Sequence, residues 1–146
     1  NAHITAGIED VSNLSLNFSG GSFATIQSSW LEPRKVRRMT IVGSRKMIVY
    51  DDIEPLEKIK IYDTRVDRPP FYDSFGEFQY SYHYGNCFVP HIEQNEPLRT
   101  ECEHFVECIK NGTKPMSCGR NGRDVVRILE ACSESLKLSG APILLE

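Results

Sequence analysis

The chain has 146 residues, with 17 lysine and arginine side chains against 20 aspartate and glutamate side chains and a net charge of −3. This length predicts one domain with a core of its own, and the slight negative charge disfavours nucleic-acid binding, which needs a strongly basic face. The sequence contains no apolar run near the roughly 18 residues of a membrane span and no secretion signal at its start. We expect a soluble cytoplasmic protein without nucleic-acid or membrane partners.

The first two thirds of the chain carry the alternation of apolar and polar residues that is typical of β-strands. One hairpin is predicted around the turn at residues 19–22, and a second one within residues 30–52, around Gly43 and Ser44. A fifth strand is predicted over residues 58–63. Five strands in near-continuous meander order predict one mostly antiparallel sheet.

Residues 64–80 lose this alternation and contain two successive prolines, so we expect a long ordered loop there. Three tyrosines, Tyr80, Tyr82 and Tyr84, then alternate with Ser81 and His83 along a sixth predicted strand. The last third is helical in pattern. One helix is predicted from Glu96 to its stop at residues 111–112, and a second one from Asn121 to Gly140.

Taken together, the elements predict an α+β fold. We expect an open, mostly antiparallel sheet with helices packed on one face and with the other face available for subunit packing. Residues 143–145 are apolar and are a candidate for a short last strand. Five cysteines form no CxxC pair and are expected to be reduced, because an odd count at irregular spacing fits neither a disulfide framework nor a zinc site.

A basic cluster within the second hairpin is the first candidate for chemistry. Guanidinium groups bind phosphate or carboxylate bidentately, so such a cluster fits an anion site, and a solvated charged loop is an equally common reading. The cluster consists of Arg34, Lys35, Arg37, Arg38 and Arg45.

Other candidates have weaker patterns. His83 has the residue type of a general acid or base, although a histidine in a tyrosine-rich strand is more often packed. The tyrosines fit a sugar or partner surface and fit the wet edge of a core equally well. Glu101 and His104 have a di-iron spacing, but that site needs a second such pair, and we expect no metal.

Three blocks of the sequence resemble the C-terminal domain of the Gfo/Idh/MocA oxidoreductases. The blocks are W-L-E-P-R-K-V-R-R-M-T-I-V-G-S-R-K-M-I-V-Y-D-D at 30–52 with E-K-I-K-I-Y-D at 57–63, E-P-L-R-T-E-C-E-H-F-V-E-C-I at 96–109, and V-V-R-I-L-E-A at 125–131. The resemblance runs from Ile8 onward. Within the family, the sequence is most similar to nucleotide-sugar dehydrogenases that act on UDP-N-acetylglucosamine-type substrates. It implies a sheet that packs against another subunit and a preceding domain that holds NAD or NADP.

The chain departs from this family in its cofactor and catalytic motifs. It has no G-x-G-x-x-G, so the turn that binds the pyrophosphate is missing. The family's E-K-P segment is also absent, because Lys58 is followed by Ile59. The family's Asp and His pair is expected upstream of residue 1, and Cys118 stands where an aspartate is common.

We therefore expect residues 1–146 to form a substrate and oligomerisation domain that is inactive in hydride transfer by itself and binds no cofactor alone. Arg34, Lys35 and Arg37 are the expected contacts to an anionic sugar or nucleotide-sugar substrate, with His83 or Tyr84 as contacts to hydroxyl groups. No catalytic, cofactor-binding or metal residue is predicted. The alternative is a non-catalytic module that associates through its sheet, and both readings predict a homo-oligomer.

Overall fold

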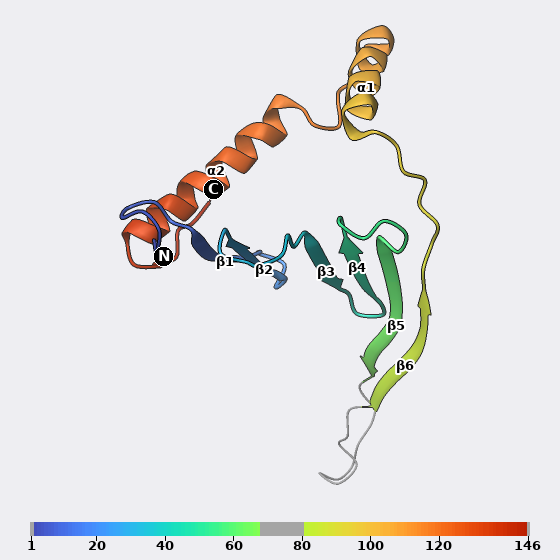
Figure 1. Ribbon diagram of the computed structural model, residues 1–146, viewed down its shortest axis with the longest axis horizontal. Helices are drawn as coiled ribbons and strands as arrows, with labels where there is room; N and C mark the ends of the chain where they lie inside the picture. The colour runs from blue at the N-terminus through green and yellow to red at the C-terminus, as the bar shows by residue number, and fades with distance from the viewer. Residues whose placement is uncertain (1, 68–80, 146) are drawn as a thin grey trace. The chain divides into compact units, whose positions relative to one another are not determined.

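The computed structural model describes residues 2–67 and 81–145, and its chain order of six strands and two helices is drawn in Figure 1. The α+β class and the open antiparallel arrangement are confirmed. The chain divides into two compact units, one formed by Asn1–Trp30 with Asn95–Glu146 and the other by Leu31–Gln94. We call these the first and the second unit and describe each by itself.

The first unit begins with a closed N-terminal segment and a β-hairpin. The carboxylate of the buried Asp10 accepts hydrogen bonds from the main-chain amides of His3 (2.6 Å) and Ile4 (2.8 Å), and lies 2.7 Å from Nδ1 of His3. Strands β1 (Val11–Asn17) and β2 (Phe23–Ser29) then pair antiparallel, as predicted. Gly21, with φ of 80°, adopts the left-handed conformation that the turn between them requires.

Helix α1 (Pro97–Asn111) begins and ends where its sequence signals stand. The Glu96 carboxylate accepts hydrogen bonds from the amides of Leu98 (3.2 Å) and Arg99 (2.6 Å), two of the donors that a helix start leaves without partners. At the other end, Gly112 has φ of 62° and its amide donates to Cys108.

Helix α2 (Gly119–Lys137) begins two residues earlier than predicted, because Cys118 takes the capping position. Asn121 lies at the third helical position, and its side-chain oxygen accepts from the Cys118 amide at 3.3 Å. The apolar stripes of both helices are largely exposed, with Phe105 at 58% and Leu129 at 58%. Within residues 2–67 and 81–145, neither helix has the length and apolar character that crossing a bilayer requires.

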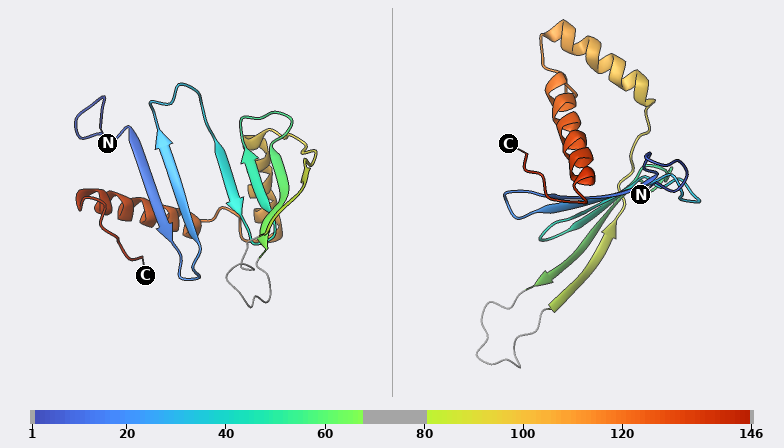
Figure 2. Two further views of the ribbon diagram at one scale, coloured as in Figure 1. Left: turned by 90° about the horizontal axis from the view of Figure 1, so that it is seen from below. Right: turned by 90° about the vertical axis from the view of Figure 1, so that its left-hand side faces the viewer.

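The second unit is a four-stranded antiparallel sheet in the order β3-β4-β5-β6. Its long strands β5 and β6 run side by side in both views of Figure 2. The strands are β3 (Arg38–Val42), β4 (Met47–Asp51), β5 (Ile59–Asp67) and β6 (Ser81–Phe88). The second predicted hairpin is thereby confirmed.

Three details differ from the expectations. The six described strands form two sheets instead of one, since β1 and β2 pair only with each other. Strand β5 continues to Asp67, so the start of the expected loop is strand, while residues 68–80, including Tyr80, lie outside the described residues. Residues 141–145 form no strand.

The register gives the sheet of the second unit two different faces. Directly opposite residues share a face, and successive residues alternate between faces. One face, which we call the apolar face, carries Met39, Ile41, Ile48, Tyr50, Ile59, Ile61 and Phe88. The other, which we call the tyrosine face, carries Thr40, Val42, Met47, Val49, Tyr62, Tyr82 and Tyr84.

A β-bulge interrupts the pairing of β5 with β6. Tyr62 pairs with Cys87 and Thr64 pairs with Tyr84. Between these two pairs β5 therefore advances by two residues and β6 by three. The extra residue lies at Gly85 and Asn86, opposite Asp63. Beyond the bulge, the polar side chains of Asp63, Arg65, Asp67 and His83 continue the same side of the sheet as the apolar face.

Candidate functional site

The predicted site residues fall into separate places in the second unit. Arg37 belongs to a network centred on Asp52, and His83 belongs to a network centred on Asp63. Asp52 follows the end of β4, whereas Asp63 lies within β5 beside the bulge. The sequence therefore identified one member of each of two polar networks.

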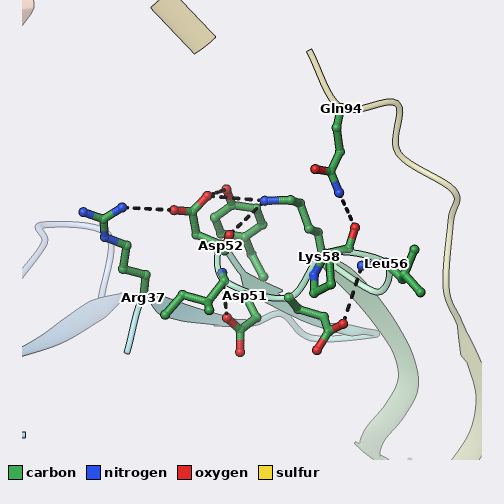
Figure 3. Close-up of polar contacts among 10 residues, drawn as sticks. Arg37, Asp51, Asp52, Leu56, Lys58 and Gln94 are labelled. Atoms are coloured by element: carbon green, nitrogen blue, oxygen red, sulfur yellow. Dashed lines mark hydrogen bonds and ion pairs between the residues drawn. The ribbon is translucent and has the colours of Figure 1, made fainter. Parts of the chain in front are cut away.

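The Asp52 network joins one carboxylate to a phenol and two cations (Figure 3). The Tyr50 hydroxyl donates to Oδ1 of Asp52 at 2.8 Å, and Arg37 lies 3.5 Å from Oδ2. Lys58 places Nζ 3.6 Å from Oδ1 and donates to the main-chain oxygen of Asp52 at 2.8 Å. Arg37 and Lys58 approach Asp52 from opposite sides.

The electrostatics of this network favour an ionised Asp52 beside a neutral Tyr50. The hydrogen bond from Tyr50 lowers the pKa of Asp52, with further lowering by the charges of Lys58 and Arg37. The same hydrogen bond raises the pKa of Tyr50 above its usual value of 10.0, because the phenol proton is held by a carboxylate. At neutral pH the network carries one more positive than negative charge.

Main-chain hydrogen bonds hold the loops that carry these side chains. The Asp52 amide donates to the Arg37 carbonyl at 2.9 Å, and the Asp51 amide donates to the Lys58 carbonyl at 2.8 Å. The side-chain amide of Gln94 donates to the carbonyl of Pro55. The network thus rests on backbone pairing and is fixed relative to the sheet.

The other cations of the basic cluster are exposed, and Arg45 lies apart from this network, in the turn between β3 and β4. Within residues 2–67 and 81–145, neither Arg34 nor Lys35 forms an ion pair or a side-chain hydrogen bond. Arg38 lies directly opposite Asp51 on the β3–β4 pair. Arg34 and Lys35 therefore present uncompensated charges, as an anion contact requires.

The Asp63 network is a row of alternating charges. His83 places Nε2 3.1 Å from Oδ2 of Asp63, and Arg65 lies 3.4 Å from Oδ1 of the same carboxylate. Arg65 also donates from Nε to both oxygens of Asp67, at 2.8 and 3.1 Å. The hydrogen bond from His83 lowers the pKa of Asp63, and the charges of His83, Arg65 and Lys46 add to this lowering.

Tyr84 does not join His83. The two residues are neighbours on β6, so their side chains point to opposite faces of the sheet. Tyr84 instead stacks with Tyr82 on the tyrosine face, with ring centroids 6.4 Å apart and planes 23° apart. One small ligand cannot use His83 and Tyr84 together.

The helices add a histidine–thiol pair. On α1, His104 accepts a hydrogen bond from the Met116 amide at 3.1 Å, and its Nε2 lies 3.6 Å from Sγ of the buried Cys108. All five cysteines are free. No three His, Cys, Asp or Glu side chains converge as metal ligands in the described part of the chain. His104 thus connects α1 to the segment that follows it.

The sequence reading missed Tyr50, Asp52, Asp63 and Arg65. Each belongs to an i, i+2 pair of polar residues, Tyr50 with Asp52 and Asp63 with Arg65, which the period of a strand places on one face. That signal was available in the sequence. The partners across strands were not, because they depend on the register and on the bulge.

Comparison of this chain with protein-family models, with curated proteins and with solved structures finds no match. The resemblance to the Gfo/Idh/MocA oxidoreductases stays a prediction that rests on the sequence blocks alone.

Proposed function

We propose that this chain is the substrate-binding and association domain of an NAD(P)-dependent sugar or nucleotide-sugar dehydrogenase of the Gfo/Idh/MocA kind, without hydride transfer of its own. The apolar face of the second unit is the observation that carries the association half. Large side chains on this face are open to solvent, including Met39 at 58%, Ile41 at 53% and Phe88 at 63%. Contiguous apolar surface of this kind marks interaction sites in proteins.

A second copy is the partner that this face fits. The four strands supply seven apolar or aromatic side chains in register, and polar networks lie near both ends of β5. Interfaces between identical subunits have this pattern of an apolar centre with a polar rim. Fully burying one large aliphatic side chain contributes about 1.5–3 kcal/mol, so burial of all seven together can offset the roughly 4–15 kcal/mol that association costs.

A matched pair of variants tests the association. Ile41→Lys places a charge on the apolar face, and Val42→Lys places the same charge on the neighbouring residue of the other face. We expect light scattering during size-exclusion chromatography to show a dimer for the wild-type chain and for Val42→Lys, and a monomer for Ile41→Lys. A wild-type monomer, or equal behaviour of the two variants, contradicts the proposed interface.

The substrate half rests on the cations that follow Trp30. Arg34 and Lys35 have no ion pair within the described residues, and Arg37 meets Asp52 only at 3.5 Å. A guanidinium group has five N–H donors, so this long contact leaves most of them available for a diphosphate. A nucleotide sugar offers such a diphosphate.

Binding of UDP-N-acetylglucosamine, followed by calorimetry, tests this half. The double variant Lys35→Glu and Arg37→Glu is expected to weaken binding about tenfold or more, since a charge-assisted hydrogen bond contributes about 1.5–3 kcal/mol. Arg45→Glu, in the turn between β3 and β4, is the control and is expected to bind like the wild type. Equal affinity of all three proteins removes these residues from the site.

The described residues do not fit a nicotinamide cofactor. Every strand pair among them is antiparallel, whereas the cradle for a dinucleotide is built on a parallel βαβ unit. We assign no residue and no step of the reaction to the cofactor.

The exposed apolar face also favours a second candidate, a non-catalytic association module. This module has the same interface and no substrate. A dimer that binds no sugar nucleotide in calorimetry supports the module, and measurable binding supports the substrate domain.

A further inference from the structure

The geometry points to Asp63 as a positioning residue that holds His83 in one tautomer, with Nδ1 free to accept a hydrogen bond from a sugar hydroxyl. This inference rests on the proposed function, because it concerns the ligand of the same domain. It assigns a role to Asp63, which the sequence did not single out, and it names the chemical group that His83 recognises.

The tautomer follows from the partners of the imidazole. An ionised carboxylate only accepts hydrogen bonds, so the 3.1 Å contact between Asp63 and Nε2 of His83 requires the proton on Nε2. The neutral ring then has its free electron pair on Nδ1. A hydroxyl group is a donor that fits this acceptor, and the His83 side chain is 36% exposed, so a ligand has access to it.

The carboxylate of Asp63 is itself held on two sides. Arg65 lies 3.4 Å from its second oxygen and is anchored in turn by Asp67 at 2.8 Å. Gly85, which lies across the bulge from Asp63, has no side chain. A Cβ atom on Gly85 would stand 2.5 Å from Oδ2 of Asp63, so only glycine leaves room for the carboxylate at the bulge.

These contacts place the expected contact between His83 and a sugar hydroxyl on one side of the sheet. His83, Asp63 and Arg65 lie on the side that continues the apolar face, and the tyrosines lie on the other. The contact with Asp63 therefore orders His83 without help from the aromatic side chains. Orientation of an imidazole by a carboxylate on its second nitrogen is a common way to fix its tautomer.

Nitrogen NMR of ¹⁵N-histidine-labelled protein at neutral pH tests the inference, with Asp63→Ala as the variant and Asp67→Ala as the matched control. We expect wild-type His83 to show a protonated Nε2 with a slowly exchanging proton. The protection of that proton is expected to be lost in Asp63→Ala and kept in Asp67→Ala. Finding the proton on Nδ1 in the wild type overturns the inference and needs no variant.

Addition of UDP-N-acetylglucosamine then tests the ligand. We expect a shift of the His83 Nδ1 signal in the wild type and in Asp67→Ala, and a smaller shift in Asp63→Ala. Binding seen at the amides of residues 34–37 with an unchanged Nδ1 signal overturns the role of His83 while the proposed function stands. No binding at any amide overturns the substrate half of the proposed function together with this inference.

Discussion

Gly85 and Asp63 approach so closely across the bulge that a Cβ atom on Gly85 would stand 2.8 Å from the main-chain oxygen of Asp63 as well as 2.5 Å from its carboxylate. The first of these contacts involves backbone, which cannot rotate away. The pairing of β5 with β6 at this point therefore depends on the absence of a side chain.

Replacing Gly85 by alanine is predicted to destabilise the second unit. Forcing extra atoms into a closed contact costs about 1–3 kcal/mol, and urea unfolding measures this loss. Gly20→Ala is the control, because nothing lies within 4 Å of a Cβ at Gly20. Equal midpoints for the two variants contradict the close contact.

The N-terminal segment is predicted to open in acid as Asp10 becomes protonated. Its pKa is lowered from 3.8 to about 2, mainly by the hydrogen bond from His3 and also by the amides of His3 and Ile4. The stabilisation is therefore present above the unfolded pKa and is lost as the pH falls through the folded one. The amide chemical shifts of His3 and Ile4 report this opening. A titration from about pH 5 to about pH 1.5 spans both the unfolded and the folded pKa of Asp10.

Asp10→Asn serves as the control for this titration. In this variant the amides of His3 and Ile4 are expected to show no transition in the same pH range, since the asparagine side chain that replaces the Asp10 carboxylate has no proton to gain. A transition near 3.8 in the wild type would instead mean that Asp10 is not held by His3.

Cys118 is predicted to react with iodoacetamide at lower pH than an ordinary thiol. Its pKa is lowered from 9.0, first by the main-chain amide of Asn121 and then by that of Arg120 and by the charge of Lys114. The thiolate is the nucleophile, so the midpoint of the rate–pH profile reports this lowering. Mass spectrometry of the peptide that contains Cys118 measures the rate.

The unfolded chain in urea is the internal comparison for Cys118. There the amides at the start of α2 no longer converge on the sulfur, and the midpoint is expected to return toward the ordinary value. Identical profiles for the folded and the unfolded chain contradict the effect of the helix start.

Removing the charge of Asp52 is predicted to lower the pKa of Tyr50. The hydrogen bond to Asp52 raises this pKa above 10.0, so Asp52→Asn is expected to bring the phenol back toward its usual range. Ultraviolet titration of the tyrosinate band measures the change. Asp51→Asn, one residue earlier and bound to the Ile53 amide, is expected to leave it unaltered.

Local signals explain which elements the sequence predicted. The turn at Gly43, the cap at Glu96 and the stop at Gly112 act within a few residues, and each begins or ends an element in the structure. The number of sheets, the extension of β5 to Asp67 and the network of Asp63 depend on partners far along the chain. The register of the strands sets such partners. The alternation of apolar and polar residues along a strand does not determine that register.

The two networks illustrate the same limit for the site. Arg37 and His83 stood out by residue type, but their contacts with Asp52 and Asp63 join residues 15 and 20 positions apart, which the sequence alone does not pair. Lys35 was equally visible and has no ion pair within the described residues. Residue type finds candidates, and only the fold separates them.

Strand β3 forms one border of its sheet, with all five residues exposed and only β4 beside it among the described strands. The outer row of amides and carbonyls on such a border is a template onto which a foreign strand can be added. Three consecutive residues there, Thr40, Ile41 and Val42, favour extended backbone. In concentrated solution this protein should first aggregate through the exposed edge of β3, and a proline within that strand should prevent the aggregation.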